Sequence, residues 1–161
     1  YINDIYLTMN VILQKGNFYI DHVNLLKKKK NTVIDGTFSK FTYSNEHFIM
    51  NGIYFELPIH NINITTDTKS TILTYQPYEK GNLEYLQYIS NIELQLLDYY
   101  NRINNTRKTP INILSKKIFF GNIKSNIPNL SKMSNIITIK ISGIWETDTE
   151  IGLAIKLMYN R

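Results

Sequence analysis

The residues best suited to acid–base or metal chemistry are three histidines, which lie far apart in segments with strand-like sequences. They are His22, His47 and His60. None belongs to an HExxH, HxH or HxE arrangement, the spacings that bring imidazole nitrogens around one metal ion. A catalytic histidine also needs a partner that positions it or takes its proton, and the sequence indicates none. The histidines are therefore interpreted as structural residues.

The closest pair of carboxylates is Asp148 and Glu150, with Glu146 just before them. Paired carboxylates can bind a cation or exchange a proton with a substrate. These acids fall in a predicted turn between two strands, where acidic side chains are ordinarily solvated. The glycines are isolated, so there is no glycine-rich phosphate loop, and no GxSxG motif occurs. We therefore predict a non-enzymatic protein with no metal and no organic cofactor.

Lysines alternate with aromatic residues in two segments, 38–43 and 116–124. In each segment a lysine and a ring share a strand face, as Phe38 and Lys40 do. Proteins that bind single strands without sequence preference combine basic residues for the phosphates with aromatic rings on which bases stack. Aromatic residues in a β-rich protein also fill its core, and this alternative applies to each ring. The predicted nucleic-acid-binding residues are Phe38, Lys40, Tyr43, Lys116, Lys117, Phe119, Lys124, Lys140 and Trp145.

The composition is consistent with an anionic partner. The chain carries a net charge of +5, and residues 110–161 hold seven basic and three acidic side chains. Such an excess near one end suits a polyanion, although ordinary solubility explains it equally well. Cysteine is absent, which excludes disulfides, zinc–thiolate sites and thiol nucleophiles. No apolar run reaches the ~18–20 residues of a membrane span, so no membrane partner is expected.

The hydrophobic pattern predicts a chain made mostly of strands. One segment differs, because apolar residues recur at three- and four-residue spacing over residues 82–103 and predict a long amphipathic helix. A short helical turn is expected at residues 111–115. The predicted strands are residues 4–14, 17–26, 32–34, 37–44, 47–57, 59–65, 70–76, 116–124, 135–145 and 151–159.

Several short antiparallel strands with one helix between them indicate a mainly β, β-rich α+β fold in a single domain, residues 1–161. The order of the elements fits an antiparallel OB-like barrel with one long inserted helix. A β-sandwich with one helix is the main alternative, because strand order and shear cannot be determined from the sequence. The chain is predicted to close on a hairpin, with an acidic turn at residues 146–150.

This closing hairpin resembles that of single-stranded DNA-binding proteins of OB-fold type from large DNA viruses. The similarity lies in residues 139–145, the acidic turn and residues 151–156, where one strand ends at Trp145 and the next opens with Gly152 and Leu153. It is confined to this C-terminal segment. The resemblance implies an OB-like fold, sequence-tolerant binding of single-stranded DNA and a role in viral DNA replication or recombination.

We therefore expect a single-stranded DNA-binding protein that acts in the host cytoplasm or nucleus, or in the virion. RNA in place of DNA, and assembly into a homo-oligomer, stay open as alternatives. A second hypothesis is a viral structural or assembly protein, a β-sandwich that acts through protein–protein contacts. A third is a domain of a larger polymerase or processivity factor, since the chain begins without methionine.

Overall fold

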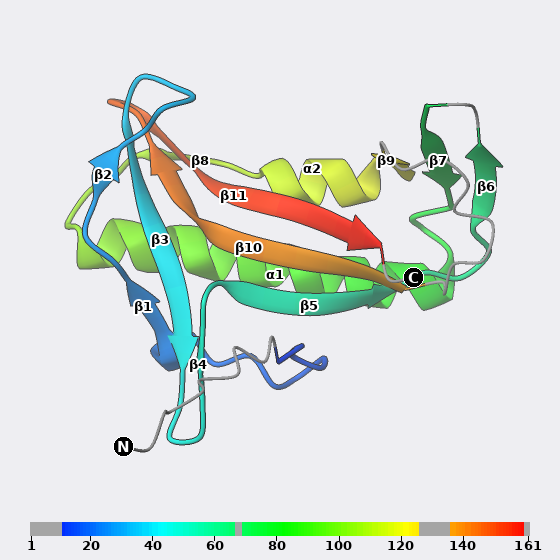
Figure 1. The fold of residues 1–161 in the computed structure, drawn as a ribbon, viewed down its shortest axis with the longest axis horizontal. Coiled ribbons are helices and arrows are strands. Elements are labelled where there is room, and N and C mark those ends of the chain that lie inside the picture. Colours follow the sequence, from blue (N-terminus) through cyan, green and yellow to red (C-terminus); the bar gives the residue numbers. More distant parts are fainter. Residues whose placement is uncertain (1–10, 67–68, 126–135, 160–161) are drawn as a thin grey trace, which may run out of the picture.

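The computed structural model describes residues 11–66, 69–125 and 136–159, which form two β-sheets and two α-helices (Figure 1). The larger sheet contains β1 (Val23–Leu25), β2 (Lys29–Lys30), β3 (Thr37–Ser44), β4 (Ile49–Met50), β5 (Ile53–Pro58), β8 (Thr109–Ile111), β10 (Ile136–Glu146) and β11 (Glu150–Tyr159). The smaller sheet contains β6 (Asn63–Thr66), β7 (Thr71–Thr74) and β9 (Asn122–Ser125). The helices are α1 (Lys80–Ile103) and α2 (Ile113–Phe119), and a short 3₁₀ helix, η1 (Ile20–His22), precedes β1.

The central strand of the larger sheet is β10. Along one edge it pairs antiparallel with β11, which forms the closing hairpin. Along the other edge it pairs with two strands in succession, β5 at residues 136–141 and β3 at residues 143–146. Beyond β11, the short strand β8 extends the sheet in the parallel direction. In the smaller sheet, β6 and β7 precede α1 and pair with each other, and β7 also pairs with β9, which follows α2.

The long helix α1 lies across one face of the larger sheet (Figure 1). Its buried apolar residues recur every three or four positions and so form one stripe along the helix, which includes Leu86, Ile89, Leu96 and Leu97. This stripe packs against the sheet, with contacts to β5 and β11. Removal of the apolar surface from water is the main force that joins helix and sheet. The sheet contributes to the same core Phe41, Ile53, Phe55, Leu57, Ile139, Ile141, Ile144, Ile151 and Leu153.

A β-bulge interrupts β10 at Ser142. The register between β10 and β11 shifts between Ile141 and Gly143, so Ser142 is an extra residue that has no partner on β11. An extra residue reverses the side of the sheet to which the following side chains point. Before the bulge the odd-numbered residues face α1, and after it the even-numbered residues Ile144 and Glu146 do.

The structure confirms the β-rich α+β class and the long helix. The predicted helix over residues 82–103 is α1, and the predicted strands 37–44, 135–145 and 151–159 correspond to β3, β10 and β11. The sheets are not closed into a barrel, so the fold resembles the expected OB-like barrel only loosely. A helix covers the larger sheet where a β-sandwich would have a second sheet (Figure 1).

Three predicted strands are wrong in whole or in part. Residues 32–34 form bends in the loop between β2 and β3, and residues 17–26 contain only the short β1 after η1. The predicted strand 116–124 is instead the end of α2, a turn and β9. A helix is favoured there because Leu114 and Ile118, four residues apart, both bury their side chains on one side.

Other predicted strands differ mainly in extent. Most of the predicted strand 4–14 lies outside the described residues, and its described part makes an isolated bridge between Leu13 and Phe55. The strands predicted between residues 47 and 76 exist, but they are shorter and appear as β4 to β7.

A buried carboxylate fixes α2 against α1. Glu93 of α1 is fully buried, and it accepts hydrogen bonds at 2.8 Å from the backbone N–H groups of both Leu114 and Ser115. The Ser115 hydroxyl donates a further bond at 2.5 Å. Both N–H groups lie in the first turn of α2, where no carbonyl within the helix can accept from them and the helix dipole favours a negative charge.

Replacing Glu93 with alanine should lower the free energy of unfolding by roughly 2–4 kcal/mol, because the buried N–H groups would lose their acceptors. Urea denaturation followed by circular dichroism measures this change. The control is Asp98→Ala, since Asp98 forms an exposed ion pair with Arg102 on the same helix and should contribute less than about 1 kcal/mol. Equal losses in the two variants would contradict the role of Glu93.

Candidate nucleic-acid interface

Two neighbouring aromatic rings lie on the face of the larger sheet that is turned away from α1. The pairing register places Phe38 of β3 opposite Trp145 of β10, and Trp145 in turn opposite Gly152 of β11. Because the bulge at Ser142 reverses the alternation, Trp145 points away from α1 while Glu146 points toward it. Both rings are half-buried, so each keeps part of its surface open.

Each of these rings lies against a glycine. A Cβ atom on Gly143 would come 2.7 Å from Cζ of Phe38, and a Cβ atom on Gly152 would come 2.6 Å from Cε2 of Trp145. Carbon atoms that are not bonded to one another do not approach so closely, so a larger residue at Gly152 would displace the Trp145 ring. A larger residue at Gly143 would clash with the Phe38 ring and also with the backbone of β3 at Ser39 and Lys40. The two glycines therefore leave room for the rings to approach the sheet closely.

A groove of about 730 Å³ opens over the rings. Phe38, Trp145 and Ala154 line it from the sheet, and residues 31–35, the loop between β2 and β3, line it from another side. Within this loop the Val33 side chain is largely exposed. The remaining lining residues are Lys30, Ile113, Thr147 and Glu150.

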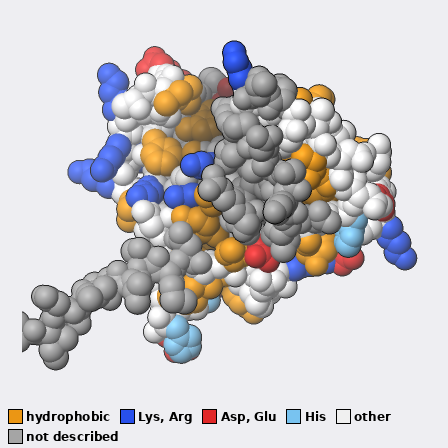
Figure 2. All heavy atoms as spheres, turned by 45° about the vertical axis from the view of Figure 1, so that its right-hand side comes forward, with side chains coloured by type: hydrophobic (Ala, Val, Ile, Leu, Met, Phe, Trp, Pro, Cys, Tyr) orange, Lys and Arg blue, Asp and Glu red, His pale blue; other side chains and the backbone are white. Residues whose placement is uncertain are grey.

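A second groove, about 850 Å³ in volume, adjoins the first and shares Ile113 with it. Three exposed lysines line it, two from α2 and one from β9. Phe120, which ends α2, lines the same groove and is 77% exposed. This groove therefore combines three positive charges with an aromatic ring that is open to solvent. Figure 2 shows Lys and Arg side chains beside hydrophobic side chains on the face of the molecule that it displays.

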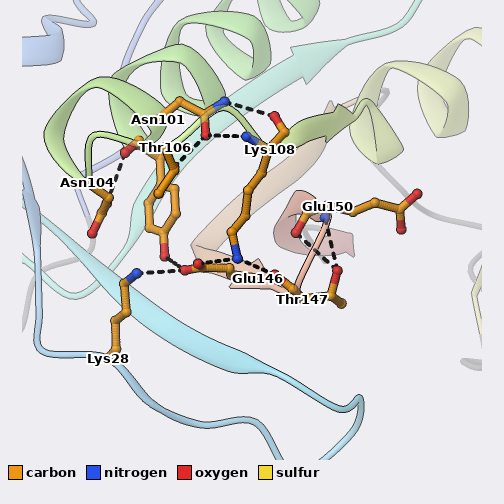
Figure 3. Close-up of polar contacts among 9 residues, drawn as sticks. Lys28, Asn101, Asn104, Thr106, Lys108, Glu146, Thr147 and Glu150 are labelled. Atoms are coloured by element: carbon orange, nitrogen blue, oxygen red, sulfur yellow. Dashed lines mark hydrogen bonds and ion pairs between the residues drawn. The ribbon is translucent and has the colours of Figure 1, made fainter.

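On the α1 side of the sheet, behind the rings, lies an ionic network centred on the buried carboxylate of Glu146 (Figure 3). Its carboxylate pairs with Lys28 at 2.8 Å and with Lys108 at 2.5 Å, and it accepts a hydrogen bond from the Tyr100 hydroxyl. Lys108 also donates to the Thr147 carbonyl. Since these residues come from the segment before β2, the end of α1, the segment before β8 and the closing hairpin, one carboxylate joins four parts of the chain.

The loop after α1 is ordered by Asn101, whose side chain directs Lys108 toward this network (Figure 3). The Asn101 amide donates to the Lys108 carbonyl at 3.0 Å and accepts from the Lys108 N–H at 3.2 Å. The Thr106 hydroxyl donates to the same side chain at 2.8 Å. Lys108 therefore reaches Glu146 from a backbone that is itself held in place.

The network keeps Glu146 ionised at neutral pH. Burial by itself would raise the pKa of this carboxyl group, but hydrogen bonds from Lys108, Lys28 and Tyr100 lower the pKa to about 2. Burial by itself would lower the pKa of Lys28, yet its hydrogen bond to Glu146 and the contact with Tyr100 raise that pKa. Burial and the neighbouring carboxylate together raise the pKa of the Tyr100 hydroxyl.

The structure places seven of the nine predicted nucleic-acid-binding residues in two groups. Four share the sheet face that is turned away from α1: Phe38, Lys40, Lys140 and Trp145. Three meet in the second groove: Lys116, Lys117 and Lys124. The lysines of the first group are half-buried, and the Lys140 ammonium lies 5.3 Å from the centre of the Tyr54 ring.

Two predicted stacking residues lie in neither groove. Tyr43 is only 1% exposed, because it points into the core from the inward face of β3 and stacks between Phe18 and Phe48. A base cannot reach this ring, so the prediction for Tyr43 is wrong. Phe119 is half-buried against the core and the Tyr78 ring, whose centre lies 5.9 Å away.

The sequence reasoning missed Phe120 and the loop at residues 31–35. A helical pattern in the sequence could have indicated Phe120. Leu114 and Ile118 lie four residues apart and so share the buried side of a helix, which leaves Phe120 and the two lysines of this helix on its other sides. The sequence of residues 31–35 has no pattern that indicates their place beside the rings. Its place beside the rings depends on the pairing of β2 with β3 and of β3 with β10.

In the described ranges, no three His, Asp or Glu side chains gather as a metal site would require. Of the helices that the structure describes, none combines the length and the apolar character of a membrane span. Comparisons with protein-family models, with curated proteins and with solved structures find no match to this chain.

The Glu146 network predicts a loss of stability in acid. Because the folded state holds the pKa at about 2, below the ordinary value of 4.5, its contribution is complete above pH 4.5 and disappears as the pH falls toward 2. We expect Glu146→Gln to lower the free energy of unfolding at pH 7 by roughly 2–4 kcal/mol and to flatten the pH dependence between pH 4.5 and 2.

Urea denaturation at pH 7, 4.5 and 3 measures both effects. The control is Asp148→Asn, which removes an exposed carboxylate from the neighbouring turn and should leave the pH dependence of stability almost unchanged. A Glu146→Gln protein with wild-type stability at pH 7 would show that the network does not hold these segments together.

Proposed function

We propose that this protein binds single-stranded DNA in a sequence-tolerant manner and does not act as an enzyme. The observation that carries the proposal is the adjacency of the two grooves. One holds two rings seated on the sheet, the other holds three lysines and the exposed Phe120, and both are lined by Ile113. Aromatic platforms beside a basic groove are the features with which proteins hold single strands.

A strand that follows both grooves would place its phosphates near Lys116, Lys117 and Lys124 and turn its bases toward the aromatic rings. A base reaches a half-buried ring only when it is unpaired and unstacked, so a duplex would first have to open. The ring positions therefore favour a single strand over a duplex. The net charge of +5 is consistent with a polyanionic partner.

The resemblance of the closing hairpin to viral single-stranded DNA-binding proteins favours DNA over RNA and a role in viral DNA replication or recombination. Two residues of that resemblance, Trp145 and Gly152, are the ring and the supporting glycine in the first groove. The proposed function and the resemblance therefore involve the same part of the molecule.

The single tryptophan makes the proposal measurable, because Trp145 lines the first groove. We expect a mixed-sequence single-stranded DNA of about 20 nucleotides to quench its fluorescence saturably, with an affinity that falls between ~50 and ~200 mM salt. The duplex of the same sequence should bind more weakly. Equal or tighter binding of the matching RNA would move the assignment from DNA to RNA. Lack of saturable, salt-dependent binding would refute the proposal and favour an assembly protein.

Lysine variants test the interaction with phosphates. Alanine at Lys116, Lys117 or Lys124 should weaken binding and reduce the slope of log affinity against log salt by about 0.7 for each phosphate that the protein no longer neutralises. Arg102→Ala is the matched control, because it removes an exposed positive charge that lines neither groove. If Arg102→Ala reduces the slope as much as the lysine variants do, net charge alone explains the binding.

A ring variant tests base stacking separately. Phe120→Ala should weaken binding by about 1–3 kcal/mol with an unchanged salt slope. Since Phe120 is largely exposed, the melting temperature of this variant should stay near that of the wild type. Tyr19→Ala, an exposed ring outside both grooves, should keep wild-type affinity. Wild-type affinity of Phe120→Ala would exclude this ring from the interface.

A further inference from the structure

Two carboxylates and one lysine, Lys30, line the groove that holds the aromatic rings, so the acids outnumber the bases there. Asp35 belongs to the loop between β2 and β3, and Glu150 is the first residue of β11. Both side chains are exposed, and among the residues that the structure describes neither forms an ion pair. The backbone of Glu150 is fixed by Thr147, whose hydroxyl accepts from the Glu150 N–H at 3.0 Å and whose N–H donates to the Glu150 carbonyl at 2.9 Å (Figure 3).

The different charges of the two grooves would direct the phosphates and the bases of a bound strand to different grooves. Carboxylates repel phosphates, whereas the lysines of the neighbouring groove attract them. A bound strand would therefore keep its phosphates on the lysine side and present only a base to the groove over Phe38 and Trp145. An ionised carboxylate accepts hydrogen bonds and cannot donate them, so the base edge that fits there must donate.

We propose that the groove over the rings is a base pocket that prefers bases with an exocyclic amino group to thymine and uracil. This inference rests on the single-strand binding proposed above and adds a base preference at this one pocket, whereas the lysine-lined groove holds phosphates of any sequence. Cytosine, adenine and guanine each offer an amino group that a carboxylate can accept from. Thymine and uracil carry a carbonyl oxygen in place of the amino group of cytosine. Their N3–H can donate, but it lies between two carbonyl oxygens, which Asp35 and Glu150 repel. These two acids are thus the specificity-determining residues of the pocket.

Oligo-deoxycytidine and oligo-deoxyuridine of equal length form the sharpest pair of probes, since the bases differ only at N3 and at the C4 substituent. Titration at pH 7.5 and one salt concentration, followed by Trp145 fluorescence, should give about tenfold tighter binding of the cytidine strand. Binding of both strands with affinities within twofold of each other would overturn the base preference and leave the proposed function intact. Failure of both strands to bind would refute the proposed function itself.

Substitution of the acids distinguishes hydrogen bonding from simple repulsion. Glu150→Met should reduce the ratio of cytidine to uridine affinity to about threefold or less, and the addition of Asp35→Ala should bring the ratio close to one. The control is Glu46→Met, which removes an exposed carboxylate near the other end of β3 and should leave the ratio unchanged. Exposure of both groove acids makes misfolding a minor concern, and melting curves check it.

An equal rise in affinity for both strands in Glu150→Met and in the double variant, with an unchanged ratio, would show that the carboxylates act only by repelling phosphates. That outcome would overturn the assignment of Asp35 and Glu150 as residues that recognise the base.

Discussion

The buried charge of Glu146 is the constraint that governs how the segments of this molecule are arranged. A carboxylate in the interior is stable only when its hydrogen-bonding capacity is filled, and here Lys28, Lys108 and Tyr100 fill it. These partners come from the approach to β2, the loop before β8 and the end of α1. To satisfy one charge, the chain must therefore bring these segments to the end of β10. At the same end of β10, the loop between β2 and β3 and the closing hairpin border the groove over the rings.

One inserted residue links this network to the groove. The bulge at Ser142 turns Glu146 toward α1 and, by the same reversal, turns Trp145 to the opposite face of the sheet. Without it, continued alternation would bury the tryptophan and expose the acid. The glycines opposite Phe38 and Trp145 then leave room for both rings to lie on the sheet. The stability of the sheet end and the shape of the candidate interface thus share a single structural cause.

The two grooves divide the surface by charge. The lysine-lined groove depends on α2, whose first turn is anchored to α1 by Glu93, and the ring-lined groove has two acids beside its aromatic rings. A uniformly basic surface would attract a polyanion without discriminating among its parts. An acidic recess next to a basic groove instead suits a ligand in which negative phosphates alternate with neutral, hydrogen-bonding bases.

Elements with a local pattern, namely α1, β3 and the closing hairpin, could be predicted from the sequence, because periods of 3.6 and two residues appear within one segment. The same alternation placed Phe38 and Tyr43 on opposite faces of one strand without showing which face is buried. The buried face, the position of the bulge and the continuation of the helical turn predicted at residues 111–115 into α2 became clear only in the folded chain. Alternation shows which residues share a face, but the choice of the buried face depends on packing partners that are remote in the chain, such as α1 against β10 and Glu93 against α2.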